Sequence, residues 1–264
     1  MAILRLGTFN LLHGMSVADQ QVDPARLSAA AEELAADVLG LQEVDRAQER
    51  SGLVDQTALI AEAMGAAHFG FVPAVHGTPG PQAGWRPAAA DDGQDTVGPT
   101  YGVGLVSRLP VAHWRVRRFE AAPHRLPLLI PAQPRPRVMW IPDEPRIALA
   151  AVVDGPAGPF SVVTAHLSFV PGYNGRQLRR IARWVEDLPR PLFLLGDFNL
   201  PGRVPARLTR YTPLAVTPTY PSWKPKIQFD HVLADGLGPD RVRRVSVRTL
   251  AVSDHCGLTV DVEL

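Results

Sequence analysis

The chain has 264 residues, 46% of them hydrophobic, and a formal net charge of +1. This length is compatible with one large sandwich or barrel, and we expect residues 1–264 to form a single domain. The near-neutral charge argues neither for nor against binding of nucleic acid, although dedicated nucleic-acid binders are more often strongly basic. No apolar run is long enough to span a membrane.

The cysteine content and the N-terminal segment bear on disulfide bonding and on localisation. The single cysteine, Cys256, excludes an internal disulfide, and we expect it to be a small buried residue and not a nucleophile. The chain enters an apolar strand directly after Met1, with no visible leader pattern. The expectation is a cytoplasmic monomer without an evident protein partner.

Three helices are predicted along the chain. Asp23 followed by Pro24 marks a helix start, because aspartate caps the free backbone N–H groups and proline fits the first helical position. A second helix should cover residues 55–64 and stop at Gly65, which readily adopts the left-handed conformation of a C-cap. A third, over residues 174–188, carries four arginines that we interpret as a solvated face.

Strand-like apolar runs outnumber these helices, which favours two packed sheets over one doubly wound sheet. They occupy residues 101–107, 147–153, 160–167, 192–195, 229–234, 245–250 and 258–264. The last run alternates apolar and polar residues, as a half-buried strand does.

Polar residues follow several apolar runs. Asp197 and Asn199 stand at the carboxyl end of the apolar strand 191–195, and their spacing of two residues predicts that both project to the same face. Asn10, Glu43 and His166 stand at the ends of other runs. Two further pairs complete the set, Asp230 with His231 and Asp254 with His255.

The ordered series Asn, Glu, His, Asp-x-Asn, Asp, Asp-His resembles the endonuclease/exonuclease/phosphatase superfamily. Its members include deoxyribonuclease I, sphingomyelinases and inositol polyphosphate 5-phosphatases. The resemblance extends from Asn10 to His255. It implies an α/β fold of the α+β kind: a four-layer α-β-β-α sandwich of two mixed β-sheets flanked by helices.

Hydrolysis of a phosphate ester requires neutralised phosphate oxygens, an activated water and a stabilised leaving oxygen. Glu43 is the first candidate ligand for a metal, and hard oxygen donors favour Mg²⁺ or Mn²⁺. The resemblance places Asn10 and Asp254 at or near the same metal.

The remaining motif residues receive catalytic roles. Asp197 is expected to orient or deprotonate the attacking water, and Asn199 to bond a phosphate oxygen. His255 needs a carboxylate partner, which the resemblance identifies as Asp230. His166 is assigned phosphate stabilisation or protonation of the leaving group. His231 is interpreted as structural.

Three segments are candidates for substrate contact. Trp223, Lys224 and Lys226 suit an anionic, partly flat substrate, although the same segment could be a rigid loop packed on the sheet. Residues 76–100 are predicted to form a mobile loop without regular structure, either functional or without a role. Residues 121–145, with seven prolines, are predicted to be an extended, partly ordered insertion. The resemblance implies that such loops surround the cleft and select the substrate, which makes this insertion the favoured specificity element. Its candidate contacts are Arg125, Arg135 and Arg137.

The sequence therefore predicts a metal-dependent phosphoesterase, nuclease-like or acting on a lipid or small molecule. A catalytically silent binding module on the same fold is the competing class, but it predicts eroded metal and water-activating positions, which are intact. A Ser-His-Asp hydrolase is disfavoured because no Gly-x-Ser-x-Gly motif occurs.

Overall fold

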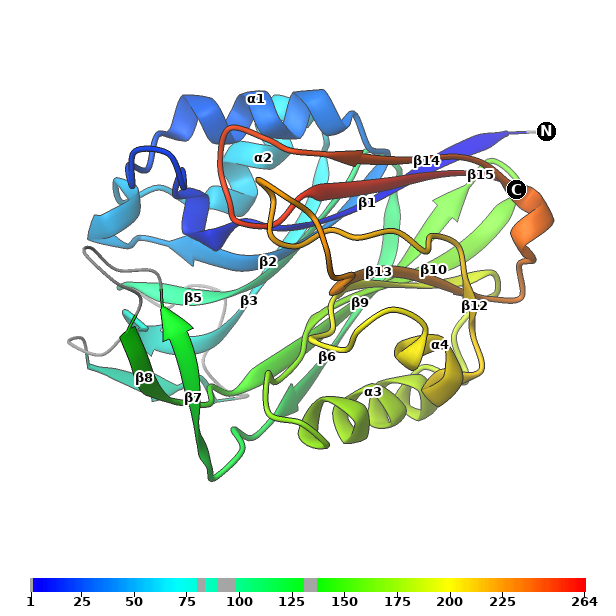
Figure 1. Ribbon diagram of the computed structural model, residues 1–264. Helices are drawn as coiled ribbons and strands as arrows, with labels where there is room; N and C mark the ends of the chain where they lie inside the picture. Colours follow the sequence, from blue (N-terminus) through cyan, green and yellow to red (C-terminus); the bar gives the residue numbers. More distant parts are fainter. Residues whose placement is uncertain (1, 80–83, 90–97, 131–136) are drawn as a thin grey trace.

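The computed structural model describes residues 2–79, 84–89, 98–130 and 137–264. Two mixed β-sheets lie face to face, with helices on both outer sides (Figure 1). The outer layers are α1 (Pro24–Leu34) and α2 (Gln56–Met64) on one side, and α3 (Tyr173–Trp184) and α4 (Val204–Thr209) on the other. Short 3-10 turns lie at η1 (Leu12–Gly14), η2 (Glu49–Ser51) and η3 (Pro239–Arg241).

Both sheets combine parallel and antiparallel neighbours. Within the described ranges, the first sheet has the order β14 (Val242–Arg248), β15 (Gly257–Glu263), β1 (Ile3–Asn10), β2 (Val38–Arg46), β5 (Thr100–Ser107), β3 (His68–Gly77), β4 (Trp85–Pro87). The second has the order β12 (Thr212–Pro213), β13 (Asp230–Asp235), β11 (Leu192–Asp197), β10 (Gly158–His166), β9 (Arg146–Gly155), β6 (Val111–Phe119). Among the described strands, two pairings are parallel, that of β1 with β2 and that of β10 with β11.

Three apolar cores separate the four layers. Phe160, Phe193 and Leu149 belong to the core between the sheets. A second core packs α1 and α2 on the first sheet, and a third packs α3 on the second. Each sheet is thus buried on both faces, which confirms the predicted four-layer α-β-β-α sandwich.

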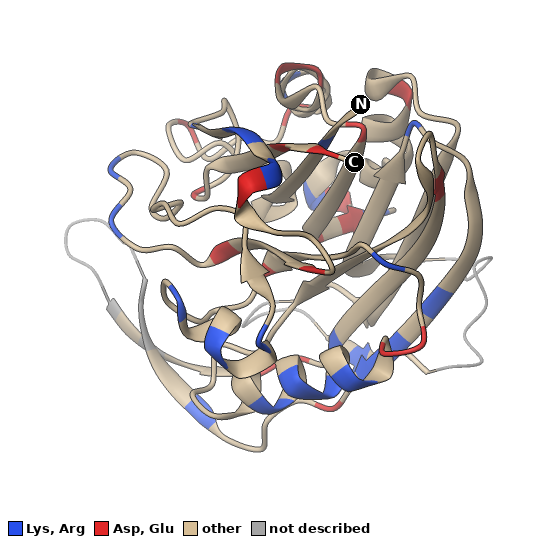
Figure 2. Ribbon diagram, turned by 90° about the vertical axis from the view of Figure 1, so that its right-hand side faces the viewer, with Lys and Arg blue, Asp and Glu red and all other residues tan. Residues whose placement is uncertain are grey.

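The helix boundaries follow the predicted caps. Asp23 accepts a hydrogen bond from Ala25 N at the start of α1, and Asp55 accepts two at the start of α2. Gly65 closes α2 with a left-handed φ of 63°. The third helix ends at Trp184 and is therefore shorter than predicted. Val185 and Leu188, which follow it, are still buried in the core. Its arginines are exposed along one face (Figure 2).

The prediction of a half-buried strand at residues 258–264 is wrong. β15 is buried throughout, because it lies between β14 and β1 and its polar side chains are covered as well. Arg5 Nε lies 2.6 Å from Asp261 Oδ1, and Arg243 pairs with Glu263. The alternation in the sequence therefore separates an apolar inner face from a face of ion pairs.

The two unusual segments contain regular structure. The prediction for 76–100 is wrong in part, since β3 continues to Gly77 and β4 pairs with it, while residues 80–83 and 90–97 lie outside the described residues. In the segment 121–145, β7 (Arg125–Ile130) and β8 (Arg137–Pro142) pair as a separate two-stranded sheet beside the sandwich (Figure 1). No helix in the described ranges is long and apolar enough to cross a membrane.

Candidate active site

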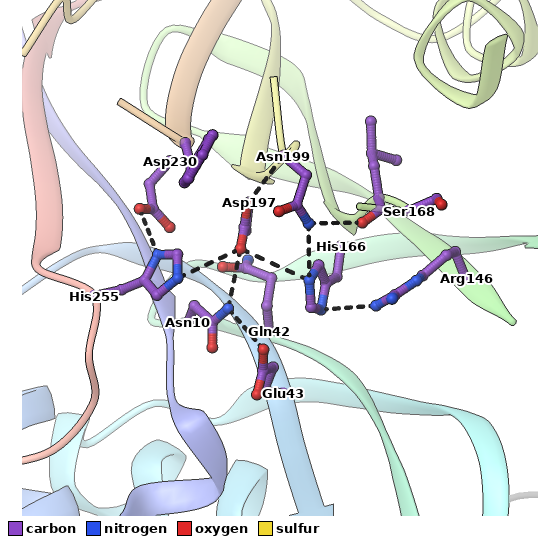
Figure 3. Close-up of polar contacts among 12 residues, drawn as sticks. Asn10, Gln42, Glu43, Arg146, His166, Ser168, Asp197, Asn199, Asp230 and His255 are labelled. Atoms are coloured by element: carbon purple, nitrogen blue, oxygen red, sulfur yellow. Dashed lines mark hydrogen bonds and ion pairs between the residues drawn. The ribbon is translucent and has the colours of Figure 1, made fainter. Parts of the chain in front are cut away.

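The candidate site lies where strands of both sheets end. Asn10 ends β1, His166 ends β10 and Asp197 ends β11. In the strand registers His166 stands beside Asp197, and Asp197 stands opposite Asp230. Polar residues that are far apart in the chain therefore meet at one edge of the sandwich (Figure 3).

A close approach of the sheets supports this edge. A Cβ atom added to Gly40 in β2 would lie 2.6 Å from Thr164 Oγ1 in β10, so only glycine fits there. Gln42 extends the contact, because its Nε2 donates to Thr164 Oγ1 at 3.0 Å and its Oε1 accepts from Thr8 at 3.2 Å. These buried hydrogen bonds fix the ends of β1 and β2 against β10.

Asp197 lies at the centre of the site. Its Oδ2 accepts a hydrogen bond from Asn10 Nδ2 at 3.1 Å, and its Oδ1 accepts one from Asn199 N at 2.9 Å. The Nε2 atoms of His166 and His255 both lie 3.7 Å from Oδ2. Burial raises the pKa of Asp197, and repulsion from Asp230 adds to the effect.

Asn199 reaches the site by a different geometry from that predicted. β11 ends at Asp197, and Asn199 has a left-handed backbone with a φ of 49°. Its Nδ2 donates to Leu167 O at 3.0 Å, and its side chain lines the same cavity as Asp197. The turn after the strand, and not the alternation of a strand, brings the two side chains together.

Glu43 lies inside β2, at an irregularity in its pairing with β5, and has a left-handed φ of 55°. A hydrogen bond of 3.1 Å joins its Oε1 to Asn10 Nδ2. Burial and the nearby Asp254 carboxylate raise the pKa of Glu43 to about 7. Burial also raises the pKa of Asp254.

His255 lies on the loop that precedes β15. Ser253 holds this loop to β1, since its Oγ donates to Asn10 O at 2.6 Å and accepts from His255 N at 3.0 Å. The Nδ1 atom of His255 lies 2.9 Å from Asp230 Oδ2, as the carboxylate prediction requires. Burial opposes a charge on this ring, but Asp230 and Asp197 outweigh it and raise the pKa of His255 to about 10.

His166 has the opposite environment. Its Nδ1 lies 3.3 Å from Nη1 of Arg146, the buried first residue of β9. Burial and the Arg146 guanidinium lower the pKa of His166 well below its usual value. Arg146 received no role from the sequence. It stands directly before the apolar run 147–153, whereas Asn10, His166 and Asp197 follow such runs.

A cavity of about 490 Å³ opens over these groups. Six predicted residues line it, namely Glu43, His166, Asp197, Asn199, Asp254 and His255. Tyr101, Glu144, Arg146, Phe169, Tyr220 and Phe229 complete the wall. Asn10 and Asp230 are buried beneath it and act through their hydrogen bonds.

Among the predicted substrate contacts, the described side chains of Trp223, Lys224, Lys226 and Arg125 are outside the lining of this cavity. Trp223 is exposed in the turn after Tyr220, with Lys224 and Lys226 beside it. Arg125 is exposed on β7. Arg135 lies outside the described residues, and the side chain of Arg137 is not described.

Two residues next to the site are structural, as predicted. His231 is buried, stacks on Phe198 and donates from Nε2 to Leu200 O at 2.8 Å. Burial lowers the pKa of His231 to about 4. Cys256 is buried as well.

The described residues contain two groups of possible metal ligands. Asp197, Asp230 and His255 have ligand atoms within 4.8 Å of one another, and Asp230 Oδ2 and His255 Nδ1 in this group are joined by a hydrogen bond. Glu43 and Asp254 line the cavity as carboxylates, and the charge of Asp254 adds to burial in raising the pKa of Glu43. A divalent cation would relieve this repulsion, and oxygen donors suit Mg²⁺ or Mn²⁺.

The fold and the site define a class of phosphoester hydrolases built on a four-layer sandwich. The model of the Endonuclease/Exonuclease/phosphatase family matches residues 7–255, and the chain belongs to this family. A comparison with curated proteins finds no match.

Solved structures share the whole fold. An endonuclease/exonuclease/phosphatase from Beutenbergia cavernae is 22% identical with a TM-score of 0.67, and the match covers 100% of this chain and 72% of that one. A mannosyl-6-phosphatase from Bacteroides thetaiotaomicron is 15% identical with a TM-score of 0.58 (99% and 100% covered). Sphingomyelinase C from Streptomyces griseocarneus is 15% identical with a TM-score of 0.56 (100% of both covered). These likenesses support the fold.

Proposed function

We propose that the protein is a divalent-metal-dependent phosphodiesterase. The observation that carries the proposal is the position of Asp197, whose carboxylate is aligned by Asn10 and Asn199 N and lies 3.7 Å from two imidazoles in one cavity. Family membership supports phosphoester hydrolysis as the reaction class.

In this proposal Asp197 orients the attacking water and accepts its proton. The raised pKa of its carboxylate suits a base that works near neutral pH. Asn10 and the Asn199 backbone fix the direction of the carboxylate, and Asn199 is proposed to bond a phosphate oxygen.

Glu43, with Asn10 and Asp254 beside it, is proposed to hold Mg²⁺ or Mn²⁺, which supplies charge neutralisation at the phosphate oxygens. His255, which Asp230 helps to keep protonated, is proposed to direct its positively charged ring at the same oxygens. His166 stabilises the phosphate or the leaving oxygen from the other side of Asp197.

The nature of the substrate beyond the phosphate is the finer part of the proposal. A nuclease-like activity is the first candidate, and phosphodiesterase or phosphatase action on a lipid or small molecule is the second. The mannosyl-6-phosphatase and sphingomyelinase names among the structural neighbours support keeping the second class. Trp223, Lys224, Lys226 and Arg125 are proposed to contact the parts of the substrate that extend beyond the cavity.

A phosphoester panel tests the proposal. It contains single-stranded, duplex and abasic DNA, RNA, phosphoinositides, sphingomyelin and bis(p-nitrophenyl) phosphate, each with Mg²⁺, Mn²⁺ or a chelator. We expect metal-dependent turnover that Asp197→Ala lowers by roughly 10³-fold, because positioned acid–base groups contribute roughly 10² to 10⁴. Asp187→Asn, at an exposed aspartate, is the control and should leave the rate unchanged.

Two outcomes would refute the proposal. The first is an absence of turnover with either metal across the panel, and the second is wild-type activity in Asp197→Ala. Where turnover occurs, a steep loss of binding with added salt favours an anionic polymer, and a weak dependence favours a lipid or small molecule.

A further inference from the structure

The contact between Arg146 and His166 determines where the proton of His166 lies. A guanidinium group has only donors and stays charged at every pH at which the protein is folded. The 3.3 Å contact from Arg146 Nη1 therefore requires a lone pair on His166 Nδ1. A neutral imidazole with a lone pair on Nδ1 has its proton on Nε2.

The surroundings of Nε2 contain one acceptor and one donor. Asp197 Oδ2, the acceptor, lies 3.7 Å away. Asn199 Nδ2 lies 3.4 Å away and donates one N–H to Leu167 O at 3.0 Å, which leaves its second N–H for Nε2. A neutral ring cannot accept at both nitrogens, so the shorter contact from the charged Arg146 donor sets the lone pair on Nδ1, and the Nε2 proton faces Asp197.

The charges around His166 disfavour a second proton on the ring. Arg146 on β9 and His255 on the opposite side of Asp197 are both positive neighbours, and the ring is buried. Within the described part of the chain, Asp197 is the one carboxylate in ion-pair contact with the His166 ring. The ring is thus neutral as well as fixed in its tautomer.

We propose that Arg146 is a positioning residue that holds His166 as a neutral imidazole with its proton on Nε2, so that His166 offers a hydrogen bond instead of a charge. In the free protein the Nε2–H faces Asp197 Oδ2 at 3.7 Å, beyond hydrogen-bond distance. In the proposed phosphoesterase reaction it is directed at a phosphoryl or leaving oxygen, and this second part rests on the proposed function.

Asp143 holds Arg146 in place. Its buried carboxylate accepts from Arg146 Nη2 at 3.2 Å, from Ser168 Oγ at 2.7 Å and from Ala122 N at 2.8 Å. Ala122 and Asp143 lie near the two ends of the insertion 121–145, and Ser168 follows His166 by two residues. The same carboxylate therefore connects the base of the insertion to the residue that orients His166.

Nitrogen NMR of the imidazole rings tests the proposal without metal or substrate. The protein is labelled with ¹⁵N-histidine, and the His166 signals are assigned with His166→Gln. At pH 7 we expect an unprotonated Nδ1 and a protonated Nε2 in the wild type. A proton on Nδ1, or an imidazolium ring, would overturn the proposal even if the protein proves to be an active phosphoesterase.

Arg146 variants test its role in the tautomer. Arg146→Met removes the donor and the charge, so the Nδ1 and Nε2 signals should shift toward a mixture of tautomers. Arg146→Lys keeps a donor and should preserve the wild-type pattern. An unchanged His166 spectrum in folded Arg146→Met would overturn the assignment to Arg146. If that variant does not fold, Arg146→Lys and the wild type still decide, since a proton on Nδ1 in either contradicts the proposal.

Discussion

Two histidines flank Asp197 at the same distance and have opposite partners. Asp230 accepts at Nδ1 of His255, whereas Arg146 donates at Nδ1 of His166. An accepting carboxylate favours the charged ring, and a donating guanidinium favours the neutral ring with its proton on Nε2. Both histidines lie 3.7 Å from the Asp197 carboxylate. Their protonation states differ because the residue that contacts Nδ1 differs.

The largest expected loss of activity comes from giving His255 Nδ1 a donating partner, as His166 Nδ1 has. In Asp230→Asn, the amide can donate to His255 Nδ1, which removes the negative partner and permits the wrong tautomer. We expect kcat/KM for bis(p-nitrophenyl) phosphate to fall roughly 10³-fold, since such a change at a catalytic histidine costs up to about 10⁴. Asp235→Asn, at the other end of β13, is the control. Equal activities of the two variants would remove Asp230 from the site.

A third histidine sharpens the comparison, because His231 is buried and its Nε2 bonds to an uncharged backbone carbonyl, that of Leu200. Its pKa is about 4 in the folded protein and about 6.5 when exposed. Between these values the unfolded chain binds a proton that the folded one does not, so stability falls as pH decreases through this window. From pH 7.5 to 5.0 this histidine should cost about 2 kcal/mol of unfolding free energy.

Urea unfolding at the two pH values measures this loss. His231→Phe retains the stacking on Phe198 but cannot take up a proton, so its loss of stability should be smaller than that of the wild type by about 2 kcal/mol. His113→Phe, on the exposed face of β6, should behave like the wild type. A His231→Phe variant with the full wild-type pH dependence would contradict the prediction.

A smaller effect is expected on the His166 side. Arg146→Met leaves the imidazole in place but releases its tautomer and orientation, so kcat/KM should fall by roughly 10 to 100-fold, as small misplacements of catalytic groups do. Arg146→Lys should recover part of the loss, since it restores a donor. Rates that are equally low in both variants would point to a loss of packing and not of the hydrogen bond.

The smallest effect is expected for an exposed arginine. Arg115 pairs with Asp187 at 2.7 Å on the surface, where water screens the attraction. Arg115→Met should leave the urea midpoint and kcat/KM at wild-type values within error. A clear loss of stability or activity in Arg115→Met would show that removing any arginine harms the protein. The loss in Arg146→Met could then not be attributed to its contact with His166.

Much of the fold and the site could be read from local patterns. Asp23, Asp55 and Gly65 cap helices through contacts within a few residues, so their roles are visible in the sequence. Asn10, His166 and Asp197 each follow an apolar run, and strands of these sheets end at the same edge. The match over residues 7–255 confirms the family resemblance, and that resemblance predicted which of these strand ends belong together.

Other features depend on partners that are distant in the chain. The burial of β15 arises because Arg5 and Arg243 cover its polar face, and alternation alone cannot reveal such ion pairs. Asn199 and Glu43 reach the site through left-handed backbone positions that no hydrophobic pattern marks. The pairing of β7 with β8 likewise lies in a segment whose prolines indicated only an extended chain.

The sequence by itself determined the fold class, the strand ends and the types of polar side chain gathered there, because these follow from periodicity, capping and the order of the motifs. The family resemblance already predicted that His255 faces Asp230, and only the tertiary structure decided that His166 faces Arg146. Protonation depends on charges and donors within a few ångströms, and those neighbours come from strands and loops 20 to 25 residues away in the chain.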